Sequence, residues 1–276
     1  MPGPDTPLDA GLVASLRGLD GNGRLLFGLR MLRMFGYGFL AVVLVLYLDA
    51  AGLDAVTIGA ILTLTLVGDT LISLWLTTNA DRIGRRRVLV AGSLLMVIAA
   101  LVFAITSWPP LLILAATVGV ISPTGNEVGP FLAVEQAALS ESVHGTRRTA
   151  TFAWYNLVGL LATAVGALLA GLVSQALIDR GVATVDAYRA VVIGYALIGL
   201  AMALGAARLG SVVEAPRNGV AAGDGASWRR FGLGRSRGVV LRLSALFTLA
   251  AFAGGFFPLS LIAFWMSLVQ TAAARP

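Results

Sequence analysis

The sequence contains no cysteine and no lysine, and its only histidine is His144. Without cysteine the chain forms no disulfide, offers no thiolate nucleophile and gives no thiolate ligand to a metal. Without lysine it forms no Schiff base and completes no phosphate-binding loop of the Walker type. A single histidine makes no metal site alone, and we expect His144 to be a solvated loop residue.

Charge is also scarce. Charged residues make up 12% of the chain and hydrophobic residues 58%, with a mean hydropathy of +0.87, whereas a soluble domain carries about 25% charged residues. These values exclude a water-soluble fold. The chain has no G-x-S-x-G, H-E-x-x-H or G-x-G-x-x-G motif, so no residue pattern supports an enzyme or a cofactor. We therefore expect no catalytic residues, no metal and no cofactor.

Long apolar runs dominate what remains. A helix needs about 20 apolar residues, and at least about 17, to cross the roughly 30 Å hydrocarbon layer. Seven runs are long enough: 27–48, 56–76, 88–107, 111–134, 151–177, 191–207 and 243–266. The acidic segment before the first run does not resemble a secretory signal, which begins with basic residues. The first run is therefore expected to remain as a membrane helix.

The arginines predict the orientation. Placing the N-terminus in the cytoplasm puts 17 of the 20 arginines on that side, and leaves outside only Arg180, Arg189 and Arg275. Arginine-rich short loops stay in the cytoplasm. The same asymmetry argues that the basic pI of 10.7 reflects membrane loops, and we expect no nucleic acid partner.

The densest group of charges lies between the second and third apolar runs, in residues 77–87. This stretch resembles the loop between helices 2 and 3 of the major facilitator superfamily, whose pattern is Gly-x-x-x-Asp-Arg-x-Gly-Arg-Arg. Thr77 replaces the first glycine, and five positions match: Asp81, Arg82, Gly84, Arg85 and Arg86. The resemblance implies that Asp81, Arg82 and Arg85 help to close a cytoplasmic gate and do not bind the solute.

The resemblance also implies an all-α integral membrane fold. Residues 1–24 would be a cytoplasmic segment, and 25–207 a six-helix bundle made of two three-helix inverted repeats. A basic cytoplasmic linker at 208–242, a seventh transmembrane helix at 243–266 and a tail at 267–276 would follow. Superfamily transporters have twelve or more spans, so we expect a truncated chain that contains the first half and one further helix.

Two interrupted helices point to a transport pathway. Gly36-Tyr37-Gly38 interrupts the first apolar run, and Asn126 and Glu127 lie in a Gly/Pro-rich break of the fourth. Matched interruptions in repeats are typical of transport sites. Arg33 and Glu127 both come out on the order of 12 Å deep at 1.5 Å per residue. We expect these two residues to pair, with Tyr37 nearby, whereas the glycines by themselves favour close helix packing.

Three further features belong to the predicted membrane helices. Asp69 shares a helix face with Thr65, Ser73 and Thr77, either as a proton-pathway residue or as a hydrogen-bonding group between helices. Arg30 is expected to reach the lipid phosphates. Gly159, Thr163, Gly166 and Ala170 form a stripe of small residues suited to helix packing.

These features predict a multi-pass transporter of the inner or plasma membrane. It would move a small solute by alternating access, coupled to protons through Glu127, with the lipid bilayer as its surroundings. The alternative is a truncated, non-transporting fragment or accessory protein, which would need a separate second half or a homodimer. No motif names the solute or the direction of transport.

Overall fold

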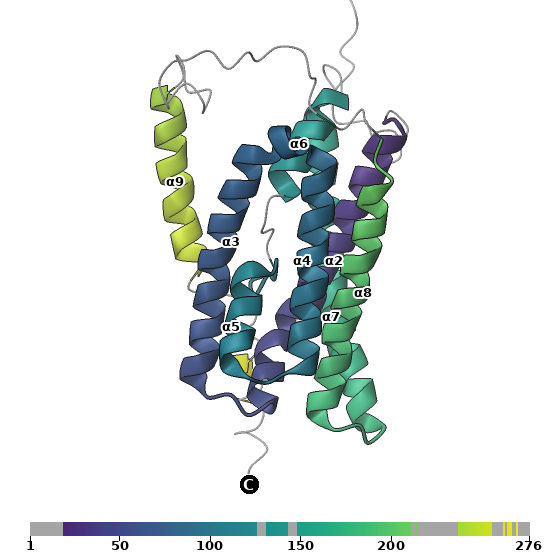
Figure 1. Ribbon diagram of the computed structural model, residues 1–276, viewed down its shortest axis with the longest axis vertical. Helices are drawn as coiled ribbons and strands as arrows, with labels where there is room; N and C mark the ends of the chain where they lie inside the picture. The colour runs from purple at the N-terminus through teal and green to yellow at the C-terminus, as the bar shows by residue number, and fades with distance from the viewer. Residues whose placement is uncertain are drawn as a thin grey trace, which may run out of the picture. The chain divides into compact units, whose positions relative to one another are not determined.

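The computed structural model describes residues 19–125, 131–142, 148–210, 214 and 237–255, and positions 262, 264–266 and 269. Within these ranges all regular structure is helical (Figure 1). The helices are α2 (Gly21–Ala50), α3 (Ala55–Ile83), α4 (Arg85–Ile105), α5 (Pro109–Val118), α6 (Phe131–Ser142), α7 (Arg148–Asp179), α8 (Thr184–Ala207) and α9 (Arg237–Gly255). The chain divides into two units, and α9 belongs to the second, residues 216–258.

In the part of the chain that the structure describes, five helices are long and apolar enough to cross a membrane: α2, α3, α4, α7 and α8. They correspond to five of the seven predicted spans. The fourth prediction is wrong as a continuous helix, because α5 ends at Val118 and α6 begins only at Phe131. The seventh, 243–266, overlaps α9, which begins at Arg237 inside the predicted linker and has a shorter apolar stretch, Leu241–Ala250.

Side-chain caps explain where the first two helices begin. The Asp20 carboxylate accepts the backbone N–H of Gly23 at 2.7 Å, so α2 begins six residues before the predicted span. Asp54 caps α3 in the same way, accepting the N–H groups of Val56 and Thr57 at 3.0 and 3.1 Å. A bond from the Thr57 hydroxyl, together with these two, holds the pKa of Asp54 below its usual value.

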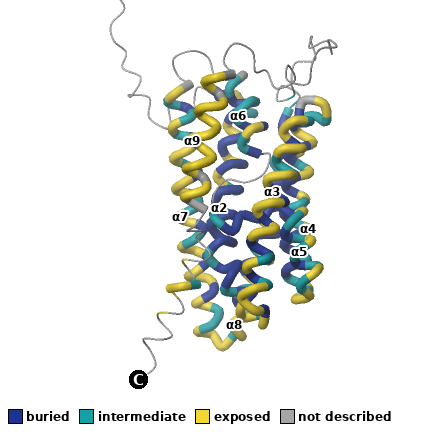
Figure 2. The backbone as a smooth tube through the Cα atoms, turned by 90° about the vertical axis from the view of Figure 1, so that its left-hand side faces the viewer, coloured by how far each residue is buried: buried dark blue, intermediate teal, exposed yellow. Residues whose placement is uncertain are grey.

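Helix α2 lies inside the first unit. Its most apolar window is 67% buried, against 33% for α3 and α7, and buried residues follow it along its length (Figure 2). The expected interruption at Gly36-Tyr37-Gly38 is wrong, since α2 continues through it. The two glycines serve packing instead, Gly36 beside Ile198 of α8 and Gly38 against α7.

Helix pairing follows the order expected of two related three-helix repeats. Helix α2 packs on α7, α3 on α5, and α4 on α8. One repeat would consist of α2, α3 and α4, and the other of the broken helix α5/α6 followed by α7 and α8. The first helix of each repeat then packs on the second helix of the other, and the two third helices, α4 and α8, pack together. This exchange is the packing expected of two related repeats, and their inverted topology stays a prediction.

Glycines bring two of these pairs into backbone contact. A Cβ built on Gly38 would lie 2.0 Å from the carbonyl oxygen of Thr163, and one on Gly166 would lie 2.1 Å from that of Phe35. Gly68 of α3 meets the Thr117 carbonyl of α5 in the same way, at 2.0 Å. Small residues at membrane helix interfaces allow such approach. The predicted packing role of the small-residue stripe on α7 is thereby confirmed.

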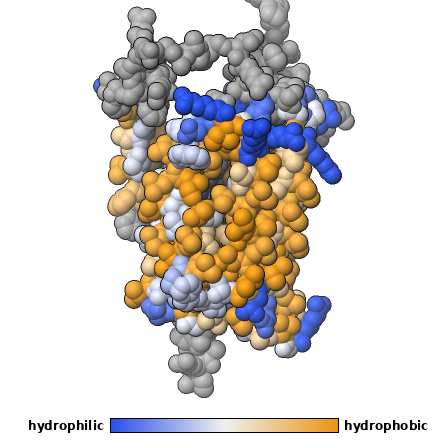
Figure 3. Space-filling view, in the orientation of Figure 1, coloured by the Kyte–Doolittle hydropathy of each residue, from blue (hydrophilic) through white to orange (hydrophobic). Residues whose placement is uncertain are grey.

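The outer surface suits hydrocarbon. Large apolar side chains are exposed along α3 and α7, among them Leu71, Trp75, Leu160 and Leu168. On the face in Figure 3, hydrophobic residues form a belt and hydrophilic residues gather at its two ends. This distribution is the one expected of a protein that crosses a bilayer several times.

Candidate functional site

A buried ion pair joins α2 and α6. The Arg33 guanidinium donates from Nη1 to Oε1 of Glu135 at 2.5 Å, and from Nη2 to Oε2 at 2.8 Å. Both residues are 0% exposed. Two parallel bonds between a planar fork and a carboxylate form the strongest common type of charge-assisted contact. Charges are rare inside membrane segments, so this pair is the first candidate for function.

A tyrosine and a second arginine complete the cluster. The Tyr155 hydroxyl of α7 donates to Oε2 of Glu135. The Arg30 guanidinium lies 4.1 Å from the centroid of the Tyr155 ring and donates to the Tyr155 carbonyl at 2.8 Å and to Oδ1 of Asn156 at 3.1 Å. Arg30 is only 4% exposed, so the expectation that it reaches the lipid surface is wrong. A stacked aromatic ring and a backbone carbonyl hold it inside.

Local sequence makes room for these large groups. A Cβ on Gly159 would lie 2.8 Å from Nε of Arg30, so only glycine leaves space for the guanidinium on this face of α7. The Phe131 ring lies 4.8 Å from Cζ of Arg33, and Gly92 of α4 accommodates that ring. The small residues of α4 and α7 therefore position the charged groups of α2.

The structure brings together some of the predicted site residues. Arg33 and Tyr37 are both fully buried on α2, one helical turn apart. Asn126, Glu127 and His144 lie outside the described residues, and a contact between Arg33 and Glu127 stays a prediction. Glu135 was missed, because the predicted fourth span ended at Val134.

The polar stripe on α3 lies partly inside the unit. Asp69 is 8% exposed and Thr65 is 1% exposed, whereas Thr77, two turns beyond Asp69, is exposed. Asp69 follows Gly68, the contact point with Thr117 of α5. Its buried position agrees with both interpretations of the sequence, and its role stays a prediction.

Tyrosine hydroxyls satisfy backbone carbonyls where membrane helices end. Tyr195 of α8 donates at 2.7 Å to the carbonyl of Val120, two residues after α5. Tyr47 of α2 donates at 2.5 Å to the carbonyl of Phe103 in the last turn of α4. Such carbonyls lack an intrahelical partner and are costly in hydrocarbon. The break after α5 is thus stabilised by a residue of another helix.

The basic turn between α3 and α4 is built around Gly84. Its φ of +103° is one that residues other than glycine rarely adopt. Gly84 lies between the end of α3 and the start of α4 and has no side chain that could cap either helix. The Glu214 carboxylate supplies the cap, accepting the N–H of Arg85 at 2.8 Å and that of Arg86 at 3.4 Å. An anion at a helix N-terminus satisfies free N–H groups and the helix dipole.

The other residues of this turn have different surroundings. Arg85 is 6% exposed, whereas Arg82 and Arg86 are exposed. The backbone of Asp81 lies in the last turns of α3, and its side chain is outside the described part. Gly210, just after α8, donates to Asn22 of α2 at 3.0 Å, so this turn, the start of α2 and the end of α8 lie at one end of the first unit (Figure 1).

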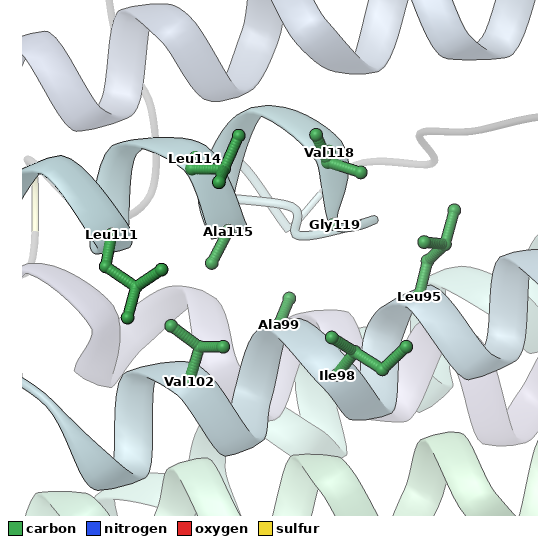
Figure 4. Close-up of a pocket in the computed structure, with 9 residues that line it drawn as sticks. All are labelled: Leu95, Ile98, Ala99, Val102, Leu111, Leu114, Ala115, Val118 and Gly119. Carbon is green, nitrogen blue, oxygen red and sulfur yellow. The ribbon is translucent and has the colours of Figure 1, made fainter.

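An apolar pocket of about 250 Å³ lies elsewhere, between α4 and α5 (Figure 4). Ile98 and Val102 line it from α4, and Leu111 and Leu114 from α5. None of its lining side chains carries a hydrogen-bonding or ionisable group. Ligand sites for polar solutes need a few placed polar groups, so the buried ion pair, and not this pocket, is the candidate site.

The sequence of these helices matches a known protein family. The model of the Major Facilitator Superfamily matches residues 26–274. The chain belongs to the major facilitator superfamily. The resemblance inferred from residues 77–87 is therefore confirmed, as is the helical membrane fold. Membership in this superfamily points to a multi-pass membrane transporter rather than an enzyme.

One relative is a membrane protein of baker's yeast. The Saccharomyces cerevisiae protein "Uncharacterized membrane protein YJR124C" is 38% identical to this superfamily member over 175 residues, which are 63% of this chain and 39% of the yeast protein. The chain thus aligns with about two fifths of that relative's length. The name of the yeast protein supports the membrane location and gives no solute.

Proposed function

We propose that this superfamily member moves a small organic solute across the cell membrane by alternating access, with proton coupling through the Arg33–Glu135 pair. The observation that carries the proposal is the burial of both charges between α2 and α6. In the superfamily the solute path lies between helix bundles near the middle of the membrane. A carboxylate held there can take up and release a proton as its surroundings change.

The coupling residue in this proposal is Glu135. The sequence pointed to Glu127, eight residues earlier and outside the described residues. Glu135 makes contacts that the proposal needs: two bonds from Arg33 and one from Tyr155. Glu127 stays a candidate for the same pathway, together with Asn126 and Asp69.

A second bundle is part of the proposal. Alternating access needs two walls that move against each other, whereas α2–α8 make up one six-helix bundle in the superfamily arrangement. Exposed apolar faces on α3 and α7 suit contact with either lipid or a further bundle. We propose that helices outside this bundle, or a second copy of it, supply the other wall. An accessory, non-transporting role is the alternative.

Flux measurements test these proposals. The full chain is reconstituted in proteoliposomes, its oligomeric state is determined, and uptake of labelled carboxylates, amines and sugars is followed across a proton gradient. We expect gradient-driven uptake by a dimer or by the chain with a co-expressed partner half, and none by a monomer. Uptake by a demonstrated monomer would refute the need for a second bundle. Absence of uptake from every assembly would favour the accessory role.

The orientation is also a proposal. The arginine distribution places the N-terminus and the Gly84 turn in the cytoplasm. With this orientation the ion pair lies in the cytoplasmic half of the helices, since Arg33 is closer to the start of α2 than to its end. The solute would then reach Arg33 from the cytoplasmic side when the cytoplasmic gate opens.

A further inference from the structure

We propose that the Arg33–Glu135 pair is a joint binding site for one proton and one small organic carboxylate. The carboxylate of the solute takes the place of Glu135 on Arg33, while Glu135 takes up the proton. This inference rests on the proposed transport function and names the substrate class of the same site.

Glu135 shows which ligand the Arg33 guanidinium fits. Its two oxygens lie 2.5 and 2.8 Å from the two terminal nitrogens of Arg33, so that one carboxylate takes up both arms of the guanidinium fork. The Tyr155 hydroxyl adds a third donor on Oε2. A solute carboxylate of the same shape satisfies the same three donors. A neutral amide cannot, because one of its two terminal atoms is itself a donor.

The burial of the pair explains why proton and anion must bind together. If a proton neutralised Glu135 with no anion present, Arg33 would lose its counter-ion in a site without solvent exposure. If an anion displaced Glu135 with no proton present, the Glu135 carboxylate would lose its strongest contact there. Each ligand alone leaves a charge poorly compensated in low dielectric, and the two together leave none.

The exchange balances in atoms and charge. Glu135 goes from carboxylate to carboxylic acid by gaining one proton, the solute keeps its carboxylate, and no covalent bond of the solute changes. The new O–H of Glu135 finds an acceptor in the Tyr155 oxygen, while the Tyr155 O–H is free to donate to the solute. One proton therefore accompanies each carboxylate, and a monocarboxylate crosses without net charge.

The charged and titratable groups around Glu135 favour an anion. Helix α2 contributes Arg33 and, one turn away, Arg30, which stacks on Tyr155. Helix α7 contributes Tyr155, and α4 contributes Gly92 against the Phe131 ring, which is not titratable. Further groups within electrostatic range of Arg33 are Tyr37 and Tyr195, and Asp69 lies within range of Tyr195. The two charged groups that α2 contributes to this cluster are thus both guanidinium groups.

Binding to the purified full chain in nanodiscs tests the inference without requiring transport. Lactate and pyruvate are the carboxylate probes, lactamide is the neutral control of the same skeleton, and inorganic phosphate tests other oxyanions. We expect the two carboxylates to bind and lactamide not to. Affinity should rise by up to about tenfold for each unit decrease in pH, since one proton is linked to each anion. A weakly buffered sample with a pH indicator should show about one proton taken up per carboxylate bound.

Variants separate the two ligands. Glu135→Gln should bind lactate with no proton uptake and no pH dependence, and lactate should raise its melting temperature more than that of the wild type. The double variant Arg33→Gln with Glu135→Gln should remain folded and lose lactate binding. Asp186→Asn is the matched control, because it breaks the exposed Arg189–Asp186 pair of α8 and should leave binding and proton uptake unchanged.

Several results would overturn the inference. These are no carboxylate binding by folded wild type, binding without proton uptake, equal binding of lactamide, or binding of phosphate in place of the carboxylates. Failure of the transport function gives a different result: carboxylate binding with proton uptake but no flux in any assembly. Flux of a neutral or cationic solute without carboxylate binding would leave transport standing and remove the assigned class.

Discussion

The Glu214 carboxylate accepts the backbone N–H of Arg85 at 2.8 Å, across 129 residues of sequence. Glu214 follows α8, and Arg85 opens α4, so the chain after the last helix of the bundle is tied to the turn between α3 and α4. Gly84 permits this contact. A Cβ on Gly84 would lie 3.1 Å from the nearer Glu214 oxygen, which is tighter than ordinary van der Waals contact.

Replacing Glu214 tests the value of this cap. Glu214→Ala removes the acceptor of the first N–H groups of α4 and the negative charge at the positive end of its dipole. We expect a loss of about 1 kcal/mol in stability, measured as a lower melting temperature in detergent. Asp186→Asn, at an exposed pair on α8, is the control and should change stability little. Equal stability of Glu214→Ala and wild type would show that the contact contributes nothing.

Replacing Gly84 tests the backbone of the same turn. Gly84→Ala should cost about 1–3 kcal/mol, because alanine is strained at a φ of +103°. Gly59→Ala is the matched control, since Gly59 lies within α3 and a Cβ there meets nothing within 4 Å. It should be neutral or stabilise by up to about 1 kcal/mol. Similar effects of both substitutions would contradict the assigned role of Gly84.

The close contact between α2 and α7 predicts a larger loss of stability than the Gly84 turn does. Gly38→Ala places a methyl group 2.0 Å from the Thr163 carbonyl oxygen, so the two helices must separate. We expect at least about 3 kcal/mol of destabilisation and loss of monodisperse protein in size-exclusion chromatography. Gly28→Ala is the control on the same helix, because the space around Gly28 is open. A stable, monodisperse Gly38→Ala protein would refute the backbone contact.

A double-mutant cycle tests the ion pair as a structural element. Arg33→Gln and Glu135→Gln should each cost about 3–5 kcal/mol, because each leaves one buried charge without its counter-ion. The double variant should be more stable than either single variant, since it buries no unpaired charge at this position. Melting temperatures of the four proteins in one detergent give the coupling. Additive losses would mean that the two side chains do not interact.

Thiol labelling tests the orientation. The native chain has no cysteine, so single cysteines report without background. Cysteines replacing Ser142 and Ser211 should resist a membrane-impermeant thiol reagent in intact cells, while one replacing Ala51 should react. Labelling after membrane permeabilisation provides the control for all three positions. The reverse pattern would place the Gly84 turn outside the cell.

Features set by local sequence were predicted well. Long apolar runs gave the five spanning helices, because length and hydropathy are properties of a run by itself. The Gly84 turn was recognised from its own residues. The stripe of Gly159 and Gly166 on α7 predicted close packing, because small residues at these spacings share one helix face.

Features that depend on distant contacts were missed. The depth of Glu127 was counted along a continuous helix, but the helix breaks after Val118, which invalidates that count. Glu135 then lies opposite Arg33, although it falls one residue past the predicted span. The mostly apolar residues from Phe131 to Leu139 are the signal in the sequence that the helix extends past Glu135. The position of Arg30 near the start of the first span predicts a surface location, whereas its buried position depends on Tyr155, 125 residues away in the sequence.

The break between α5 and α6 gives the two members of the ion pair different mechanical supports. Arg33 lies on α2, whose backbone contacts that of α7 directly at Gly38 and Gly166. Glu135 stands on α6, a helix of 12 residues that no continuous α-helix joins to α5. A short helix of this kind can move independently of the packed helices α2 and α7. A movement of this three-turn helix alone would separate Glu135 from Arg33 and would leave the contact between α2 and α7 in place.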